Sequence, residues 1–155
     1  MRTGLALVLV ALPLWAVAAG VSGQPVAIPG VERPERARQN YILKCQGCHG
    51  AEARGDLSQT PPMAGMVSQF LSVPGGRDYL ARVPGVATAP VGNAELAELL
   101  NWTLLRFDAA HIPTGFKPYE ASEMARLRKS PLRTDAAAVR RTLIENISNS
   151  RATGK

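Results

Sequence analysis

The chain has 155 residues, of which 46% are hydrophobic, 19% charged and 5% aromatic, with a net charge of +6. This length predicts one domain with an appended tail, and this composition excludes a wholly disordered chain. After the first two dozen residues no apolar run reaches the ~18 residues of a membrane span, which excludes a polytopic membrane protein. Two cysteines, three residues apart, exclude a scaffold held together by several disulfides.

The first 23 residues are typical of a secretory signal peptide. A positively charged start, an apolar stretch and small residues follow one another, which predicts cleavage after Ala18, Ala19 or Gly23. An uncleaved anchor is the alternative, but Pro13 interrupts the stretch, which is short for a span. We therefore expect a mature protein that begins near residue 24, in an exported, oxidising compartment, most simply a bacterial periplasm.

Helices account for the expected regular structure, because apolar residues recur at helical spacing and no strand-like alternation occurs. The clearest helix begins at Asn93, expected as its N-cap, and places Leu96, Leu99 and Phe107 on one face. The last eight residues are expected to fray. In chain order, the expected helices cover residues 35–44, 78–83, 93–107, 120–130 and 135–147, with Gly- and Pro-rich loop over 45–66 and a strap over 86–92.

Positive charge is concentrated in the tail. Residues 24–123 carry 9 Lys and Arg against 10 Asp and Glu, a net charge of −1, whereas residues 124–155 carry 8 against 2, a net charge of +6. Such a tail suits acidic partners or anionic surfaces, and a solvated helical face is the alternative. Nucleic acid is not expected as a partner of an exported chain that lacks interleaved aromatic and basic residues.

The chemistry of the chain centres on Cys45-Gln46-Gly47-Cys48-His49. Two thiols separated by two residues suit addition to the two vinyl groups of a haem, which forms two thioether bonds. The adjacent histidine is then held beneath the iron as an axial ligand. We therefore predict one haem c, with Cys45 and Cys48 as its attachment points and His49 as the proximal metal ligand.

Three other uses of the cysteine pair fit less well. A thioredoxin-like redox pair needs a preceding strand, but helix and loop flank this motif. A structural zinc site needs two further ligands, and His111 is the only other histidine. A disulfide between Cys45 and Cys48 closes a tight, strained loop.

Residues 34–107 resemble the class I monohaem cytochromes c. In that family a helix with an aromatic residue leads into the haem motif, and Tyr41 lies four residues before Cys45. A Pro-x-Leu-x-Gly-like element follows the motif, and its place is taken by Pro61-Pro62-Met63-Ala64-Gly65. The family ends in an aromatic-bearing helix that crosses the first, and Trp102 lies in such a helix.

The resemblance implies an all-α, cytochrome c-like fold around one covalently bound haem. It also implies that the Pro61 carbonyl accepts a hydrogen bond from His49 and that Met63 packs against the haem. The expected organisation is a signal peptide over 1–23, a cytochrome c domain over 24–110 and a basic helical C-terminal extension over 111–155.

One departure from the family concerns the sixth iron ligand, which is usually a methionine in the strap before the last helix. The strap of this chain contains no methionine, histidine or lysine. Met63, Met66 and His111 stay open as ligands, and so does an iron without a sixth ligand; Met124 lies beyond the final helix of the resemblance. An open iron binds CO, nitric oxide or peroxide, whereas a His/Met pair suits electron transfer.

The expected function is one-electron transfer in the periplasm, without chemistry on a substrate. The expected donor is a dehydrogenase, such as a quinoprotein dehydrogenase, and the acceptor an oxidase or another cytochrome. The alternative is a five-coordinate haem protein that binds a diatomic gas or peroxide. As a further hypothesis, Arg77, which follows two glycines, pairs with a haem propionate.

Overall fold

The computed structural model describes residues 27–56 and 60–153, so the predicted signal peptide lies outside the described residues. Helices form the regular structure of these ranges, which confirms the all-α prediction, and none of them is long and apolar enough to cross a membrane. The elements, with η for a 3-10 helix, are α1 (Pro34–Lys44), α2 (Gln46–His49), η1 (Val67–Ser72), α3 (Gly76–Arg82), α4 (Pro84–Ala87), α5 (Asn93–Asp108), η2 (Ala109–His111), α6 (Ala121–Leu127) and α7 (Ala136–Thr153).

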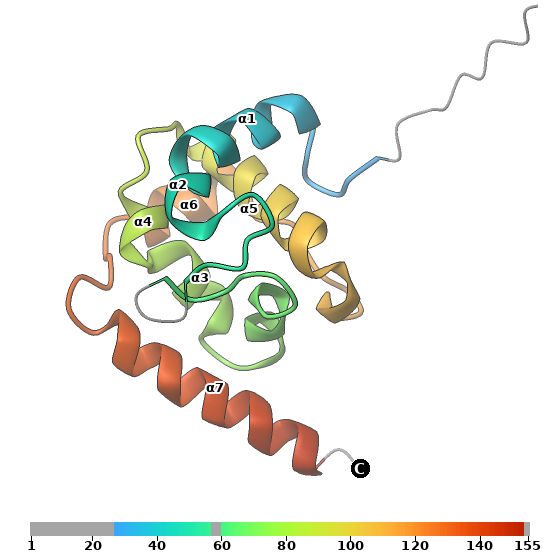
Figure 1. The fold of residues 1–155 in the computed structure, drawn as a ribbon, viewed down its shortest axis with the longest axis vertical. Coiled ribbons are helices and arrows are strands. Elements are labelled where there is room, and N and C mark those ends of the chain that lie inside the picture. The colour runs from blue at the N-terminus through green and yellow to red at the C-terminus, as the bar shows by residue number, and fades with distance from the viewer. Residues whose placement is uncertain (1–26, 57–59, 154–155) are drawn as a thin grey trace, which may run out of the picture.

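The first helix, α1, packs against α5 (Figure 1). Ala37 and Tyr41, one turn apart, form the buried face of α1. The ring of Tyr41 lies 4.8 Å from that of Phe107 and 5.6 Å from that of Trp102, both on α5. These spacings are those of favourable aromatic pairs. The predicted packing of the last aromatic-bearing helix against the first is confirmed.

A buried carboxylate fixes the first turn of α1 on α5. Glu98 is only 5% exposed, and its two oxygens accept hydrogen bonds from the Arg33 backbone N–H at 2.7 Å and from the Arg36 Nε at 2.8 Å. The Arg36 Nη2 lies 2.7 Å from the same carboxylate. Because the buried charge is both paired and hydrogen-bonded, it holds α1 in register without an unsatisfied group.

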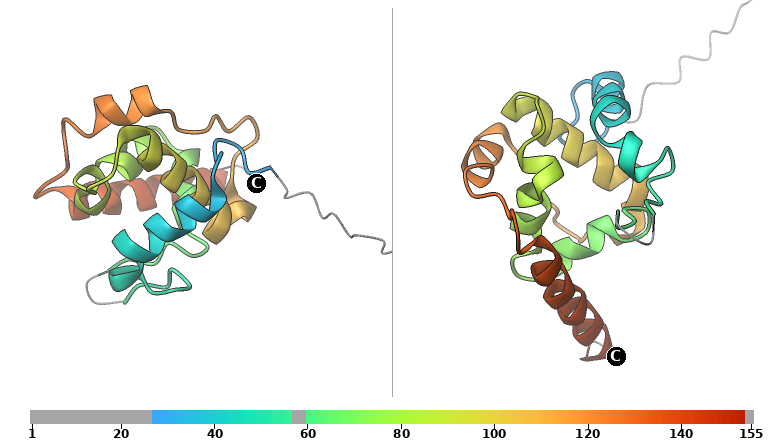
Figure 2. Two further views of the ribbon diagram at one scale, coloured as in Figure 1. Left: turned by 90° about the horizontal axis from the view of Figure 1, so that it is seen from above. Right: turned by 60° about the vertical axis from the view of Figure 1, so that its left-hand side comes forward.

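The C-terminal extension shares the hydrophobic core with the helices that precede it. α6 packs on α3 and α5, and α7 packs on η1 and α3. In the right-hand view of Figure 2, the end of α7 projects away from the other helices. The side chains that the extension buries in the core are Tyr119, Met124, Leu127, Leu132, Leu143 and Ile147. Residues after the last helix of the cytochrome resemblance therefore help to build the core.

Asn101 joins three segments of the chain. Its Nδ2 donates to the carbonyls of Gly30 and Tyr119 at 3.0 and 3.1 Å, and its Oδ1 accepts from the Tyr119 N–H at 2.8 Å. Gly30 has a φ of +70°, and a Cβ there would lie 2.4 Å from the Pro118 Cβ. This close approach, with the positive φ, is the physical reason for glycine at that position.

Two predictions about helix ends are wrong. Asn93 is the first residue of α5 and makes no side-chain cap; its Oδ1 instead accepts a hydrogen bond from Arg128 at 3.1 Å. Residues 148–153 continue α7 and are not frayed. There the hydroxyls of Ser148, Ser150 and Thr153 bond to carbonyls three or four residues earlier, which gives these polar groups partners within the helix.

Candidate functional site

The motif that carries Cys45, Cys48 and His49 folds as one helical turn. The amides of Cys48 and His49 both bond to the Cys45 carbonyl, at 3.2 and 3.0 Å. Gly50 ends the turn with a φ of +77°. Cys45 thus lies directly before the turn and Cys48 within it, three residues on, and His49 follows at once.

Both thiols of this turn are free, and their surroundings differ. Cys45 is partly buried and packs against the hydrophobic core, whereas Cys48 is exposed. Burial raises the pKa of the Cys45 thiol to about 11. Each cysteine thus has an unengaged sulfur for a covalent bond, one beside the core and one at the surface.

His49 is partly buried, and burial lowers the pKa of its imidazole, while the Pro61 backbone carbonyl acts in the opposite direction. The Nδ1 atom of His49 is buried and has no hydrogen-bond partner at ordinary distance and angle. The predicted neighbourhood of His49 and Pro61 is therefore present, but a well-formed hydrogen bond between them is not. A neutral imidazole can ligate a metal through Nε2 while its Nδ1 faces a backbone carbonyl.

The loop after the motif returns to the turn that carries His49. The Ala53 carbonyl accepts hydrogen bonds from the amides of Met63 and Ala64, at 2.9 and 3.1 Å. On the other side of the motif, the Tyr41 hydroxyl donates to the Gly50 carbonyl at 2.6 Å. Hydrogen bonds thus hold both flanks of the motif, and those to Ala53 bring residues 61–64 beside it, as the family resemblance implies.

These residues fit a covalently attached haem. Two free thiols lie on one helical turn, and the Nδ1 of the histidine beside them is buried near the Pro61 carbonyl, which suits ligation of the iron through the opposite ring nitrogen. In the ranges that the structure describes, no group of three or more His, Cys, Asp and Glu side chains could hold a metal ion. A zinc site at the cysteines therefore finds no further ligands there.

The candidates for a sixth ligand differ in their surroundings. Met63 and Met66 are partly buried and pack against the edge of the core. Met124 is 0% exposed, so its sulfur is enclosed by protein atoms of the core. The side chain of His111 is 40% exposed, and its Nδ1 lies 2.5 Å from Oδ1 of the buried Asp108.

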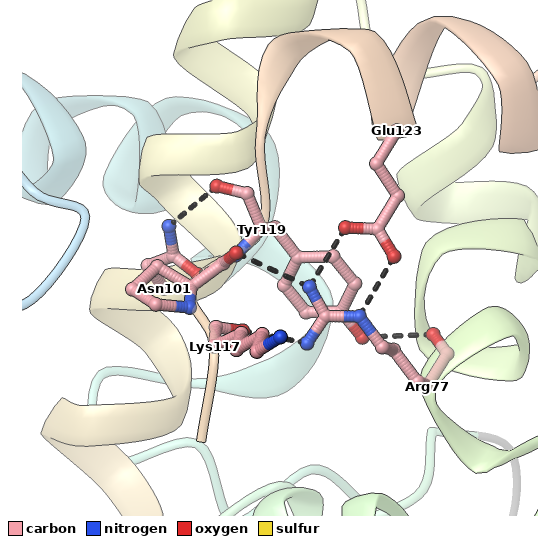
Figure 3. A network of polar contacts seen from close by, with 6 residues as sticks. Arg77, Asn101, Lys117, Tyr119 and Glu123 are labelled. Atoms are coloured by element: carbon pink, nitrogen blue, oxygen red, sulfur yellow. Dashed lines mark hydrogen bonds and ion pairs between the residues drawn. The ribbon is translucent and has the colours of Figure 1, made fainter. Parts of the chain in front are cut away.

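The hypothesis that Arg77 pairs with a haem propionate is wrong (Figure 3). Its Nε and Nη2 each lie 2.7 Å from an oxygen of Glu123, and its Nη groups also donate to the carbonyls of Lys117 and Pro118 at 2.7 and 3.2 Å. The guanidinium stacks on Tyr119, 4.1 Å from the ring centroid. Hydrogen bonding to Glu123 raises the pKa of Arg77. Arg77 therefore joins α3 to the extension.

The residues that hold the C-terminal extension to the preceding helices were not predicted from the sequence. Glu123 binds Arg77, and Arg128 donates to backbone carbonyls of the strap. The sequence does indicate that the strap needs hydrogen-bond donors such as Arg128. It is rich in Gly, Pro, Val and Ala, so it has backbone carbonyls but few side chains that could donate to them. No sequence spacing identifies the distant arginine that does so.

Two curated proteins are similar to this chain. Cytochrome c-552 of Thermus thermophilus is 32% identical over 107 residues, which cover 57% of this chain and 82% of that protein. A second cytochrome c-552, from a named strain of the same species, is also 32% identical over 107 residues, with 57% of this chain and 72% of that protein covered. No protein-family model matches the chain, and no solved structure matches it.

Proposed function

The chain belongs to the c-type cytochromes, and from this membership we propose an exported carrier of single electrons with one haem, attached at Cys45 and Cys48 and ligated by His49. The observation that carries the proposal is the helical turn on which two free thiols directly precede a histidine, whose position beside the Pro61 carbonyl suits a ring that faces the backbone through Nδ1 and the iron through Nε2. A covalently bound haem supplies a reversible one-electron iron couple.

The chain's own residues have distinct roles in this proposal. Cys45 and Cys48 each donate a sulfur to a thioether bond, which fixes the cofactor to one turn of helix. His49 gives one ring nitrogen to the iron and turns Nδ1 toward the Pro61 carbonyl, which already acts on the imidazole. Residues 61–64, bonded to Ala53, keep that carbonyl beside the ring.

Location and partners are part of the same proposal. The predicted leader over residues 1–23 places the mature chain in the periplasm, with a module over 24–110 and an extension over 111–155. A dehydrogenase, such as a quinoprotein dehydrogenase, is the proposed electron donor, and an oxidase or another cytochrome is the acceptor. Exposed basic side chains on the extension suit an acidic partner; among them are Lys129, Arg141 and Arg151.

One observation favours a second function, ligand binding at a five-coordinate iron. The strap over 86–92 has a single polar side chain, that of Thr88, and its hydroxyl already donates to the Pro84 carbonyl at 2.6 Å. Met124 is enclosed in the core, and His111 pairs with Asp108. If neither Met63 nor Met66 reaches the iron, the described residues leave its sixth position to an external ligand.

Mass spectrometry of the chain matured with haem in a periplasm tests the proposal. We expect one haem per chain, recovered on the peptide that contains Cys45 and Cys48, and a redox titration that fits a single one-electron step. Replacing both cysteines with alanine should abolish attachment, whereas His111→Ala, the matched change at the other histidine, should leave it intact. A wild-type chain without covalent haem would overturn the proposal.

The partner surface needs a separate experiment. Replacing Lys129, Arg141 and Arg151 with glutamate reverses exposed charges outside the core, so folding should be retained. We expect slower electron delivery to an acidic redox partner and a weaker dependence of the rate on ionic strength. An unchanged rate and salt dependence would remove the extension from the partner interface.

A further inference from the structure

The strap between α4 and α5 has backbone carbonyls that need hydrogen-bond donors. Ala87 and Ala89 are each 6% exposed, and burial without a partner would penalise their carbonyls. The strap's own polar side chain, Thr88, bonds to Pro84 and serves none of them. Within the strap, the Val91 amide donates to the Ala89 carbonyl at 2.8 Å. The carbonyls of Ala87 and Val91 still need donors from elsewhere in the chain.

Arg128, directly after α6, supplies them. Its Nε donates to the Ala87 carbonyl at 2.9 Å, its Nη2 to the Ala89 carbonyl at 2.5 Å and its Nη1 to the Val91 carbonyl at 2.9 Å. Nη1 also donates to the Asn93 side chain at 3.1 Å. One planar guanidinium thus binds three alternate carbonyls and the start of α5, which a lysine, with one donor atom, cannot reproduce.

The base of this arginine is rigid. Met124 and Leu127, on the preceding turn, are 0% and 3% exposed and anchor α6 in the core. The Arg128 amide bonds to the Met124 carbonyl at 3.1 Å. The guanidinium is therefore held by packed structure at one end and by the strap at the other, which makes the contact a clamp and not a chance surface pairing.

The strap that Arg128 holds packs against the same hydrophobic core as the haem-attachment motif. Val86 and Val91 of the strap and Cys45 of the motif all pack against one hydrophobic cluster. We propose that Arg128 is a positioning residue that fixes the strap, and that the extension thereby limits the access of external ligands to the haem. This inference rests on the proposed haem attachment at Cys45 and Cys48.

Hydrogen exchange of the haem-loaded protein tests the first part. In Arg128→Lys, which keeps the charge, we expect the amides of Ala89 and Val91 to exchange at least tenfold faster than in the wild type. Arg133→Lys, at an exposed position of the extension, should leave them unchanged. A measurement on the wild type needs no variant: the Arg128 Nε–H should exchange far more slowly than that of Arg133. Equal Nε–H exchange rates for the two arginines would overturn the inference, and so would strap amides that exchange at the wild-type rate in Arg128→Lys.

CO binding to the ferrous protein tests the second part. We expect Arg128→Lys to bind CO faster than the wild type and Arg133→Lys to match it. Faster amide exchange in the strap with an unchanged rate of CO binding would also overturn the inference, because the strap would then not limit the access of ligands to the iron. Failure of the proposed function is distinguishable, since it is seen in the wild type as the absence of covalent haem.

Discussion

Arg77 and Glu123, 46 residues apart, form a two-pronged ion pair in which Nε and Nη2 of the arginine each lie 2.7 Å from a carboxylate oxygen. The Tyr119 hydroxyl donates to the Arg77 carbonyl at 2.8 Å, so the side chain and the backbone of Arg77 both bind the extension. Parallel hydrogen bonds between guanidinium and carboxylate fix the geometry of both groups. Residues 117–123 are thereby attached to α3 as part of the fold.

Replacing Arg77 with alanine should therefore lower stability and leave the haem potential unchanged. Loss of the hydrogen bonds to a charged group costs about 2 kcal/mol in the free energy of unfolding. Urea unfolding and a redox titration of the haem-loaded variant measure the two quantities. Arg133→Ala, which removes an exposed charge, is the matched control. A shifted potential with unchanged stability would contradict this account and restore the propionate hypothesis.

A chain that stops after Phe107 should not fold cooperatively. The truncation removes Met124, which is fully buried, and five other core side chains of the extension. It also leaves Arg77 without Glu123 and Asn101 without Tyr119. Lost apolar burial of this size exceeds the margin of a small domain. Circular dichroism during urea unfolding gives the answer. A single sharp transition in the truncated protein would show that the module is independent of its extension.

The haem motif and the principal helices were predictable from the sequence because their signals are local. A run such as 93–107 carries its helical period within itself, and the order Cys45, Cys48, His49 specifies attachment chemistry within five residues. The predicted crossing of the last helix with the first came from the family resemblance, and the structure places the rings of Tyr41 and Trp102 5.6 Å apart where these helices meet.

The contacts between the extension and the preceding helices could not be predicted in this way. Arg77 follows two glycines in a pattern that also suits an anion-binding turn, and only the tertiary arrangement brings Glu123 to it. Asparagine is a common N-cap residue, but the side-chain oxygen of Asn93 accepts a hydrogen bond from the guanidinium of Arg128 instead. Fraying was predicted from the position of these residues at the end of the chain, whereas Ser148 and Thr153 bond within the helix that Leu143 and Ile147 anchor.

The two glycines before Arg77 serve different purposes, and substitution should show it. Gly75 has a φ of +80°, whereas a Cβ on Gly76 would lie 1.8 Å from the Phe70 carbonyl oxygen. Gly76→Ala must displace backbone, so we expect a loss of about 3 kcal/mol or more in the free energy of unfolding.

Gly85→Ala is the matched control, because Gly85 lies within α4 and a Cβ there meets no atom within 4 Å. That change should leave stability unchanged or raise it by up to about 1 kcal/mol. Denaturant unfolding of both variants measures the difference. Equal effects of the two substitutions would show that α3 and η1 are not packed as closely as described.

The stability of the protein should fall as the pH rises above 10. Burial raises the pKa of Tyr41 from 10.0 to about 12, and burial also raises that of Tyr119. Between pH 10 and 12 the unfolded chain has released these protons and the folded chain has kept them, so the free energy of unfolding declines with pH. Well below pH 10 both states hold the protons, and the contribution is constant.

Urea unfolding at intervals from about pH 8 to about pH 11.5 checks this expectation. Each tyrosine contributes a slope of up to about 1.4 kcal/mol per pH unit within its range. Tyr41→Phe should have a shallower decline above about pH 10 and the same slope as the wild type below about pH 9. A decline of equal steepness in the variant would mean that Tyr41 is not a buried phenol in the folded protein.

The optical spectrum of the protein matured with haem tests the central claim most directly. It is recorded oxidised, reduced, and reduced in the presence of CO. An electron carrier with a closed iron predicts covalent haem with a low-spin ferrous spectrum that CO does not change, and Met63→Ala and Met66→Ala would then identify the ligand. A high-spin ferrous spectrum with rapid CO binding would contradict simple electron transfer and favour the ligand-binding function. The absence of covalent haem would contradict the account as a whole.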